Sequence, residues 1–212
     1  MDRSNDITLL KRMYYAVKIF SESLYLLYRF RKTPEKSVTL FGSARTDCPK
    51  ETLELGYNIG AALAKADWAV ITGGGPGVMA AANKGCFDHG GNSIGCNIKL
   101  PNEQIPNNHT TLSVTCRFFV NRKRVLIANA KCFVALPGGY GTLDELFEVM
   151  TLVTTKQIKA IPIILVDREF WKPLLNYIDT TLTVDYKTVD PRKDILHLVD
   201  TPEELIQLLE HV

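Results

Sequence analysis

The sequence predicts an α/β fold, a Rossmann-like, doubly wound parallel sheet with helices on both faces. Short apolar segments alternate with helical segments along most of the 212 residues. The apolar segments do not alternate with polar residues, which is typical of parallel strands that are buried on both faces. Three of the segments end in glycine-rich turns, and ligands of such folds bind beyond the carboxyl ends of the strands.

The composition favours a single hydrophobic core and excludes several classes of protein. Apolar residues make up 46% of the chain and charged residues 23%, which argues against disorder. The net charge of +2 is too small to indicate nucleic-acid binding. Five scattered cysteines without a C-x-x-C pair, and four well-separated histidines, predict neither a disulfide framework nor a metal site.

The first element is an amphipathic helix that we assign to residues 1–33. Residues 7–30 contain charged side chains, which excludes a secretory signal and a membrane span, so we expect a cytoplasmic protein. The helix ends near Thr33-Pro34. Its apolar residues recur in alternating steps of three and four: Leu10, Met13, Val17, Phe20, Leu24 and Leu27. This seam packs either against its own domain or against a second subunit.

We expect the remaining residues, 34–212, to form one Rossmann-like domain without repeats or linkers. Apolar runs predict strands at residues 38–41, 68–72, 93–98, 132–136 and 161–166. Helices are predicted at residues 51–66, 78–87, 118–130, 141–155, 170–182 and 202–211. Residues 101–111 are predicted to form a polar loop.

Three glycine-rich turns follow predicted strands. They begin at Gly42-Ser43, at Gly73-Gly74-Gly75-Pro76-Gly77 and at Pro137-Gly138-Gly139. Glycine allows a ligand to approach the backbone amides, and a helix that starts after the turn adds unpaired N–H groups. The turns therefore predict an anion site for phosphate; alternatively, the glycines serve only tight turns. The dinucleotide fingerprint and the Walker A motif are both absent.

Two charged positions have two interpretations each. Arg122-Lys123 lies in a predicted helix, where basic residues either form a solvated face or bind a ligand. Glu145 lies three residues after Thr142, so it either completes a capping box or acts as a catalytic carboxylate.

The segment Pro137-Gly138-Gly139-Tyr140-Gly141-Thr142-Leu143-Asp144-Glu145, with Arg122-Lys123 upstream, resembles the signature of the LOG family. Members of that family are cytokinin riboside 5′-monophosphate phosphoribohydrolases, long labelled lysine decarboxylases. Residues 73–79 and 100–104 resemble its bacterial branch, and the similarity extends from Val38 to the C-terminus.

The resemblance implies a Rossmann-like homodimer whose site is completed at the subunit interface. Arg122 and Glu145 match the catalytic arginine and glutamate of the family. The expected substrate contacts, from the resemblance and the glycine turns together, are Gly42, Ser43, Gly74, Gly75, Met79, Glu103, Lys123, Gly138, Gly139, Tyr140, Gly141, Thr142, Leu143, Asp144 and Thr151. Ala80 departs from the family pattern, because many bacterial members have glutamate at this position.

The resulting expectation is hydrolysis of the N-glycosidic bond of a purine nucleoside 5′-monophosphate, without a cofactor or metal. The substrate is AMP or an isopentenyl-modified AMP, and the sequence does not separate the two. A non-catalytic nucleotide or cofactor carrier on the same fold is the main alternative. A pyridoxal-dependent lysine decarboxylase is disfavoured because no histidine precedes a lysine.

Overall fold

The computed structural model describes residues 3–100, 105–189 and 195–211. Within them, a seven-stranded sheet has the order β4-β3-β2-β1-β5-β6-β7, and every pair of neighbouring strands is parallel. The strands are β1 (Ser37–Phe41), β2 (Ala69–Thr72), β3 (Ser93–Ile98), β4 (Leu112–Cys116), β5 (Cys132–Ala135), β6 (Ile163–Val166) and β7 (Leu196–Val199). The predicted doubly wound α/β class is confirmed.

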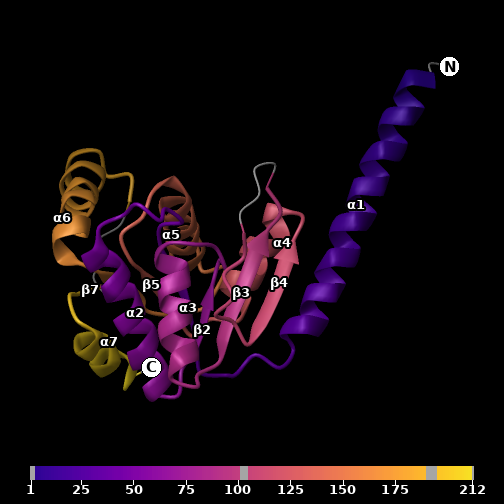
Figure 1. The fold of residues 1–212 in the computed structure, drawn as a ribbon. Coiled ribbons are helices and arrows are strands. Elements are labelled where there is room, and N and C mark those ends of the chain that lie inside the picture. The colour runs from indigo at the N-terminus through magenta and orange to yellow at the C-terminus, as the bar shows by residue number, and fades with distance from the viewer. Residues whose placement is uncertain (1–2, 101–104, 190–194, 212) are drawn as a thin grey trace.

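Helices cover both faces of this sheet (Figure 1). They are α1 (Arg3–Phe30), α2 (Lys50–Lys65), α3 (Val78–Asp88), α4 (Phe119–Ala128), α5 (Tyr140–Thr154), α6 (Arg168–Tyr177) and α7 (Pro202–Leu209), with a π-helical segment η1 (Ile178–Asp185) after α6. One apolar cluster joins α2, α3 and α7 to the sheet, and a second joins α4, α5, α6 and the end of α1 to it. The sheet is therefore buried from two sides, as its apolar strands require.

The five predicted strands are present, and every residue of β1, β2, β3, β5 and β6 is buried. The chain order reverses at β1, which pairs with β2 on one side and β5 on the other. Val38, for example, lies opposite both Val70 and Cys132. Such a reversal opens a crevice at the carboxyl ends of β1 and β5, where ligands of this fold class bind.

Two strands and one helix boundary differ from the sequence prediction. The edge strands β4 and β7 were not predicted. Each is partly exposed, so neither shows a fully apolar run. The single helix expected at residues 170–182 is instead α6 followed by the π-helical η1, and α6 contains Pro173. Proline removes a backbone donor inside a helix, which is consistent with irregular winding beyond it.

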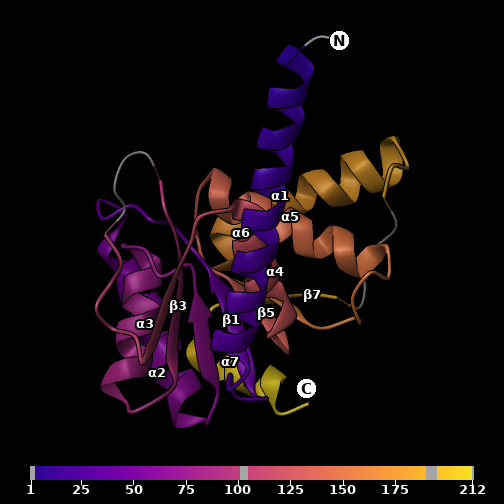
Figure 2. The same ribbon diagram turned by 90° about the vertical axis from the view of Figure 1, so that its right-hand side faces the viewer.

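The long first helix is present and lies against β4 and α4 with its C-terminal half (Figure 2). Leu26 and Phe30 are buried in the main core. The six seam residues lie on another side of the helix, and each is between 52% and 65% exposed. The interpretation that the seam packs against its own domain is therefore wrong, because a different face of the helix makes that contact. Among the described residues, none of the helices combines the length and the apolar character that a membrane span requires.

Candidate functional site

A cleft of about 680 Å³ lies at the carboxyl ends of β1 and β5, where the strand order reverses. Its size is within the range of small-molecule sites. Nine of the predicted site residues line it: Gly42, Ser43, Met79, Arg122, Gly138, Gly139, Gly141, Thr142 and Glu145. The fold thus brings together residues from the first and third glycine turns, from α3 and from α4.

The second glycine turn packs against the backbone of the first one. Gly77 has φ +68°, and a Cβ on it would lie 2.4 Å from the carbonyl oxygen of Arg45 and 2.6 Å from that of Ser43. The amide of Gly74 donates to Oγ1 of Thr72 at 2.9 Å, so it is already satisfied within the protein. Gly74 and Gly75 do not line the cleft. The structural interpretation therefore accounts for Gly77 by close packing of backbone against backbone, and for Gly74 by its close approach to the side chain of Asn97.

The third glycine turn leads into the N-terminus of α5. Gly139 is the N-cap residue and makes no side-chain cap, and the first bond into the helix runs from the amide of Leu143 to the carbonyl of Gly139. The amides of the first turn therefore lack partners within the helix. The positive end of the helix dipole also lies here, which favours an anion. A Cβ on Gly138 would lie 2.1 Å from Oγ1 of the buried Thr142, so only glycine fits this turn.

Arg122 and Glu145 form a nearly buried ion pair in the cleft. Nη1 of Arg122 donates to Oε1 of Glu145 at 3.0 Å, and the two side chains are 11% and 13% exposed. Nε of Arg122 donates to the carbonyl oxygen of Cys96 at 2.9 Å. A Cβ on Gly73 would lie 2.1 Å from Nη2 of Arg122, so glycine at that position makes room for the guanidinium. These contacts fix the arginine in one position.

The carboxylate of Glu145 is buried beside a cation. Burial raises its pKa above the ordinary value, and the neighbouring Arg122 opposes that rise. The capping-box interpretation is wrong, because α5 begins at Tyr140 with Gly139 as its N-cap. Thr142 and Glu145 both lie inside the helix. A buried carboxylate with a raised pKa and a fixed cation beside it can hold a proton or stabilise a positive charge.

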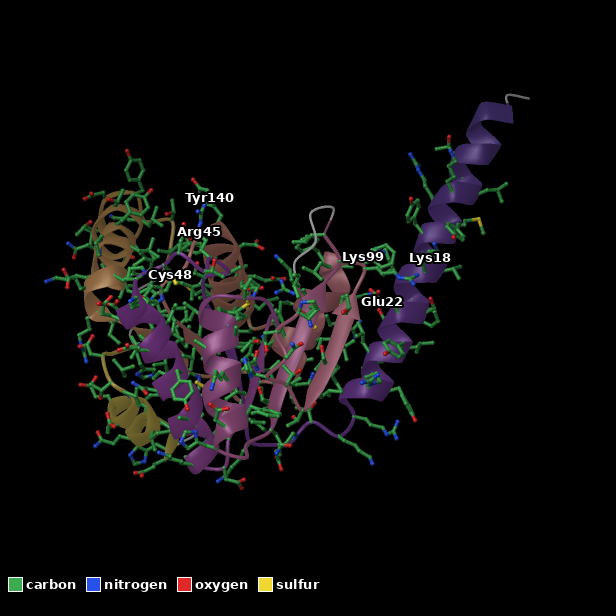
Figure 3. All side chains as sticks on the ribbon, viewed as in Figure 1. Lys18, Glu22, Arg45, Cys48, Lys99 and Tyr140 are labelled. Atoms are coloured by element: carbon green, nitrogen blue, oxygen red, sulfur yellow. The ribbon has the colours of Figure 1, made fainter. Side chains whose placement is uncertain are left out.

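Five further predicted contacts, all within the described residues, do not line the cleft. Lys123 bonds to Asp144 at 2.8 Å and to Glu148 at 3.0 Å. Oγ1 of the exposed Thr151 donates to the carbonyl of Phe147. Leu143 packs against the core. Tyr140 is 93% exposed and lies at the same edge of the domain as Arg45 (Figure 3). Glu103 lies outside the described residues. The roles of Lys123, Tyr140, Leu143, Asp144, Thr151 and Glu103 therefore remain predictions.

The cleft also contains residues that the sequence prediction did not assign to the site. Arg45 and Cys48 follow the first glycine turn, Asp167 and Phe170 follow β6, and Phe119 begins α4. The rule that sites lie beyond strand ends contained the signal for Asp167, since it directly follows a predicted strand. No group of histidine, cysteine or acidic residues suited to a metal ion occurs among the described residues.

Comparison with known proteins places this geometry in a family. A family model described as "Possible lysine decarboxylase" matches residues 79–209. A cytokinin riboside 5′-monophosphate phosphoribohydrolase of Mycobacterium marinum is 37% identical over 103 residues, which span 48% of this chain and 55% of that protein. Proteins of the same name in Rhodococcoides fascians and Oryza sativa are each 29% identical, over 78% and 81% of this chain and 85% and 67% of their own lengths.

Solved structures agree on the fold. The X-ray structure of TM1055, a structural genomics target, has a TM-score of 0.65 and 28% identity, and the match covers 84% of this chain and 99% of that chain. The molybdenum cofactor binding protein of Rippkaea orientalis has a TM-score of 0.63 at 20% identity, covering 85% and 98%. At that identity the second likeness concerns the fold alone. Because the family model matches more than half of the chain and the relatives share one name, this chain belongs to the LOG family, whose model is described as possible lysine decarboxylase.

Proposed function

We propose that the protein hydrolyses the N-glycosidic bond of a purine nucleoside 5′-monophosphate, yielding the free base and ribose 5-phosphate. The observation that carries the proposal is the buried pair of Arg122 and Glu145 beside an uncapped helix N-terminus. The carboxylate of Glu145 suits the reacting carbon, and the helix N-terminus suits a phosphate. The names of the relatives, phosphoribohydrolases of cytokinin riboside 5′-monophosphates, support the same reaction.

The amides at the start of α5 would bind the 5′-phosphate. Ser43 lies beside this turn, since its amide donates to the carbonyl of Pro137 at 3.3 Å. Anchoring the phosphate fixes the ribose relative to Glu145, and this orientation lowers the entropic part of the barrier. Arg45 at the edge of the cleft adds a cation from the first glycine turn.

Glu145 would act at C1′ of the ribose. Departure of the base leaves positive charge on the ring, and an ionised carboxylate stabilises such an oxocarbenium-like state. Water then adds its oxygen to C1′, one proton of that water is removed, and the departing base takes up a proton. Arg122 keeps Glu145 oriented and favours its charged form, against the effect of burial.

The base would contact apolar residues of the cleft. Met79, Ile98, Leu100 and Phe119 are among the residues that line it. Apolar and aromatic side chains accommodate a purine ring, and they also suit an isopentenyl substituent. AMP and isopentenyl-modified AMP are therefore both proposed as substrates.

The test is to incubate the purified chain with AMP, isopentenyl-AMP, GMP and CMP and to measure ribose 5-phosphate and free base by chromatography. We expect equal amounts of the two products from at least one purine nucleotide and little product from CMP. The Arg122→Ala variant provides a control for contaminating activity. Absence of ribose 5-phosphate from every nucleotide would overturn the proposal.

A carrier function is the second candidate, because molybdenum cofactor carrier proteins share the fold. A carrier needs the anion site and the cleft but has no need of a buried carboxylate at the reacting carbon. The same incubation separates the two functions, since a carrier returns the nucleotide intact after tight binding. A pyridoxal-dependent decarboxylase would instead show the absorbance of the bound cofactor in the purified protein, which we do not expect.

A further inference from the structure

We infer that the exposed seam of α1 is a self-association surface that pairs with α1 of a second copy of this chain. The seam consists of Leu10, Met13, Val17, Phe20, Leu24 and Leu27. Each of these side chains is more than half exposed. This inference is independent of the proposed function.

The spacing of the seam specifies a helical partner. Its residues recur in steps of three and four, as the a and d positions of a coiled coil do. A helix that only covers a globular domain shows a broader stripe, and this helix already has a separate domain-facing side. On that side Leu26 and Phe30 are buried, and Ser23 donates to Oδ1 of Asn121 at 2.8 Å. The seam thus faces away from its own domain and is open to a second helix.

The side chains beside the seam favour a second copy over a charged partner. The flanking e and g positions of the same heptads hold uncharged residues, namely Tyr14, Ala16, Ser21, Ser23, Tyr28 and Phe30. Pairing two copies therefore brings no like charges together at these flanking positions. Lys11, Lys18 and Arg29 fall at positions remote from it. A helix that lies on a lipid surface normally has its basic residues along the border of the apolar face.

The amount of apolar surface fits a dimer. Six half-exposed side chains of this size present on the order of 600 Å² on one helix, the upper end of what a monomer exposes in one patch. Two copies would bury about 1,200 Å², within the range of specific interfaces. Figures 1 and 2 show that the N-terminal half of α1 projects beyond the other described elements, so a partner helix can lie along it.

Sedimentation velocity of the full chain at micromolar concentration tests the inference. The wild-type protein should sediment at a multiple of 23.7 kDa. The double variant Phe20→Glu/Leu24→Glu places carboxylates in the seam, and it should weaken association by about 100-fold or more. The double variant Tyr15→Glu/Tyr25→Glu carries the same added charge at exposed positions outside the seam and should associate like the wild type.

A second variant keeps the test independent of folding. Leu10→Glu/Met13→Glu alters the projecting half of α1, so the circular dichroism spectrum should not change while association weakens. A monomeric wild-type protein, or an unchanged mass in both seam variants, would overturn the inference. Binding of a monomeric wild-type protein to phosphatidylserine vesicles would overturn it as well and would assign the seam to a lipid surface.

Discussion

The carboxylate of Glu22, on α1, accepts a hydrogen bond of 2.9 Å from Nδ2 of Asn121, the residue that directly precedes Arg122 in α4. The same carboxylate accepts the backbone amides of Arg117 and Phe118 at 2.7 and 3.3 Å. A residue of the first helix therefore caps the helix that carries Arg122. Asn121 strengthens the link, because its side chain also donates to the carbonyl of Ile19.

Replacement of Glu22 should loosen the start of α4. Loss of a cap costs about 0.5–2 kcal/mol, and we expect Glu22→Ala to lower the free energy of unfolding by that amount. Turnover should fall in the same variant, because Arg122 lies in the first turn of α4. Chemical denaturation and steady-state kinetics provide the two measurements. Glu35→Ala removes an exposed carboxylate that pairs only with Lys131 among its described contacts, and it should stay near the wild type in both.

Replacement of Glu145 by glutamine tests its role in catalysis. Glutamine has nearly the same shape and can still accept a bond from Arg122, but it carries no charge. Loss of an acid–base group costs on the order of 10²–10⁴ in rate. We expect turnover of AMP to fall by that factor while AMP binding, measured by calorimetry, is retained. A Glu145→Gln protein with near wild-type turnover would remove Glu145 from the mechanism.

The raised pKa of Glu145 has a defined effect on stability. A carboxyl group whose pKa is higher in the folded state than in the unfolded state binds its proton more tightly when folded. Its contribution is fully present below the ordinary pKa of glutamate and is lost as the pH rises through the raised value. The unfolding free energy of the wild type relative to Glu145→Gln should therefore decrease from acidic to neutral pH. An increase over that interval would show that Arg122 outweighs burial.

The phosphate should account for much of the substrate affinity. Hydrogen bonds to a charged group contribute about 1.5–3 kcal/mol each, so loss of two of them at the start of α5 corresponds to about 100-fold or more. We expect kcat/KM for AMP to exceed that for adenosine by at least this factor. Free ribose or ribose 5-phosphate released per unit time gives both values. Similar values for the two compounds would contradict a phosphate site at α5.

Alanine variants of Gly77 and Gly90 together test the role of the second glycine turn. Both have positive φ, +68° and +72°, but a Cβ on Gly90 would meet nothing within 4 Å. Gly90→Ala should cost only the backbone strain of about 1–2 kcal/mol. Gly77→Ala adds a clash with two backbone carbonyls, so it should lower the melting temperature further and reduce activity. Equal melting temperatures for the two variants would show that the turn tolerates displacement.

The sequence predicted the interior of the fold because each central strand is a short, mostly apolar segment that is buried on both faces. The edge strands were not predicted because neither contains a fully apolar run. In β4, the exposed Ser113 and Thr115 alternate with the buried Val114 and Cys116, directly after a polar loop. Such alternation is typical of a strand with one buried face, so the sequence did contain a signal for β4, and the pairing with β3 shows that the segment is a strand.

The candidate site was predicted in part. The glycine turns and the motif around Glu145 could be identified in the sequence, but the partner of Glu145 could not be derived from spacing. Arg122 and Glu145 are 23 residues apart, and each lies in a pattern that has a common structural meaning. Similarly, the seam of α1 was correctly assigned to a helix, yet the domain-facing side depended on Leu26 and Phe30 and on the contacts of Glu22.

Arg122 donates one hydrogen bond to the carbonyl of Cys96 and another to Glu145, so its side chain connects two separate parts of the sheet. Cys96 belongs to β3, on one side of the reversal in strand order, and Glu145 follows β5, on the other. The arginine therefore ties together the two halves of the sheet across the crevice that a substrate enters. Removing it leaves a buried carboxylate without its counterion, which costs about 3–5 kcal/mol. One side chain therefore both connects the two sides of the crevice and neutralises the carboxylate inside it.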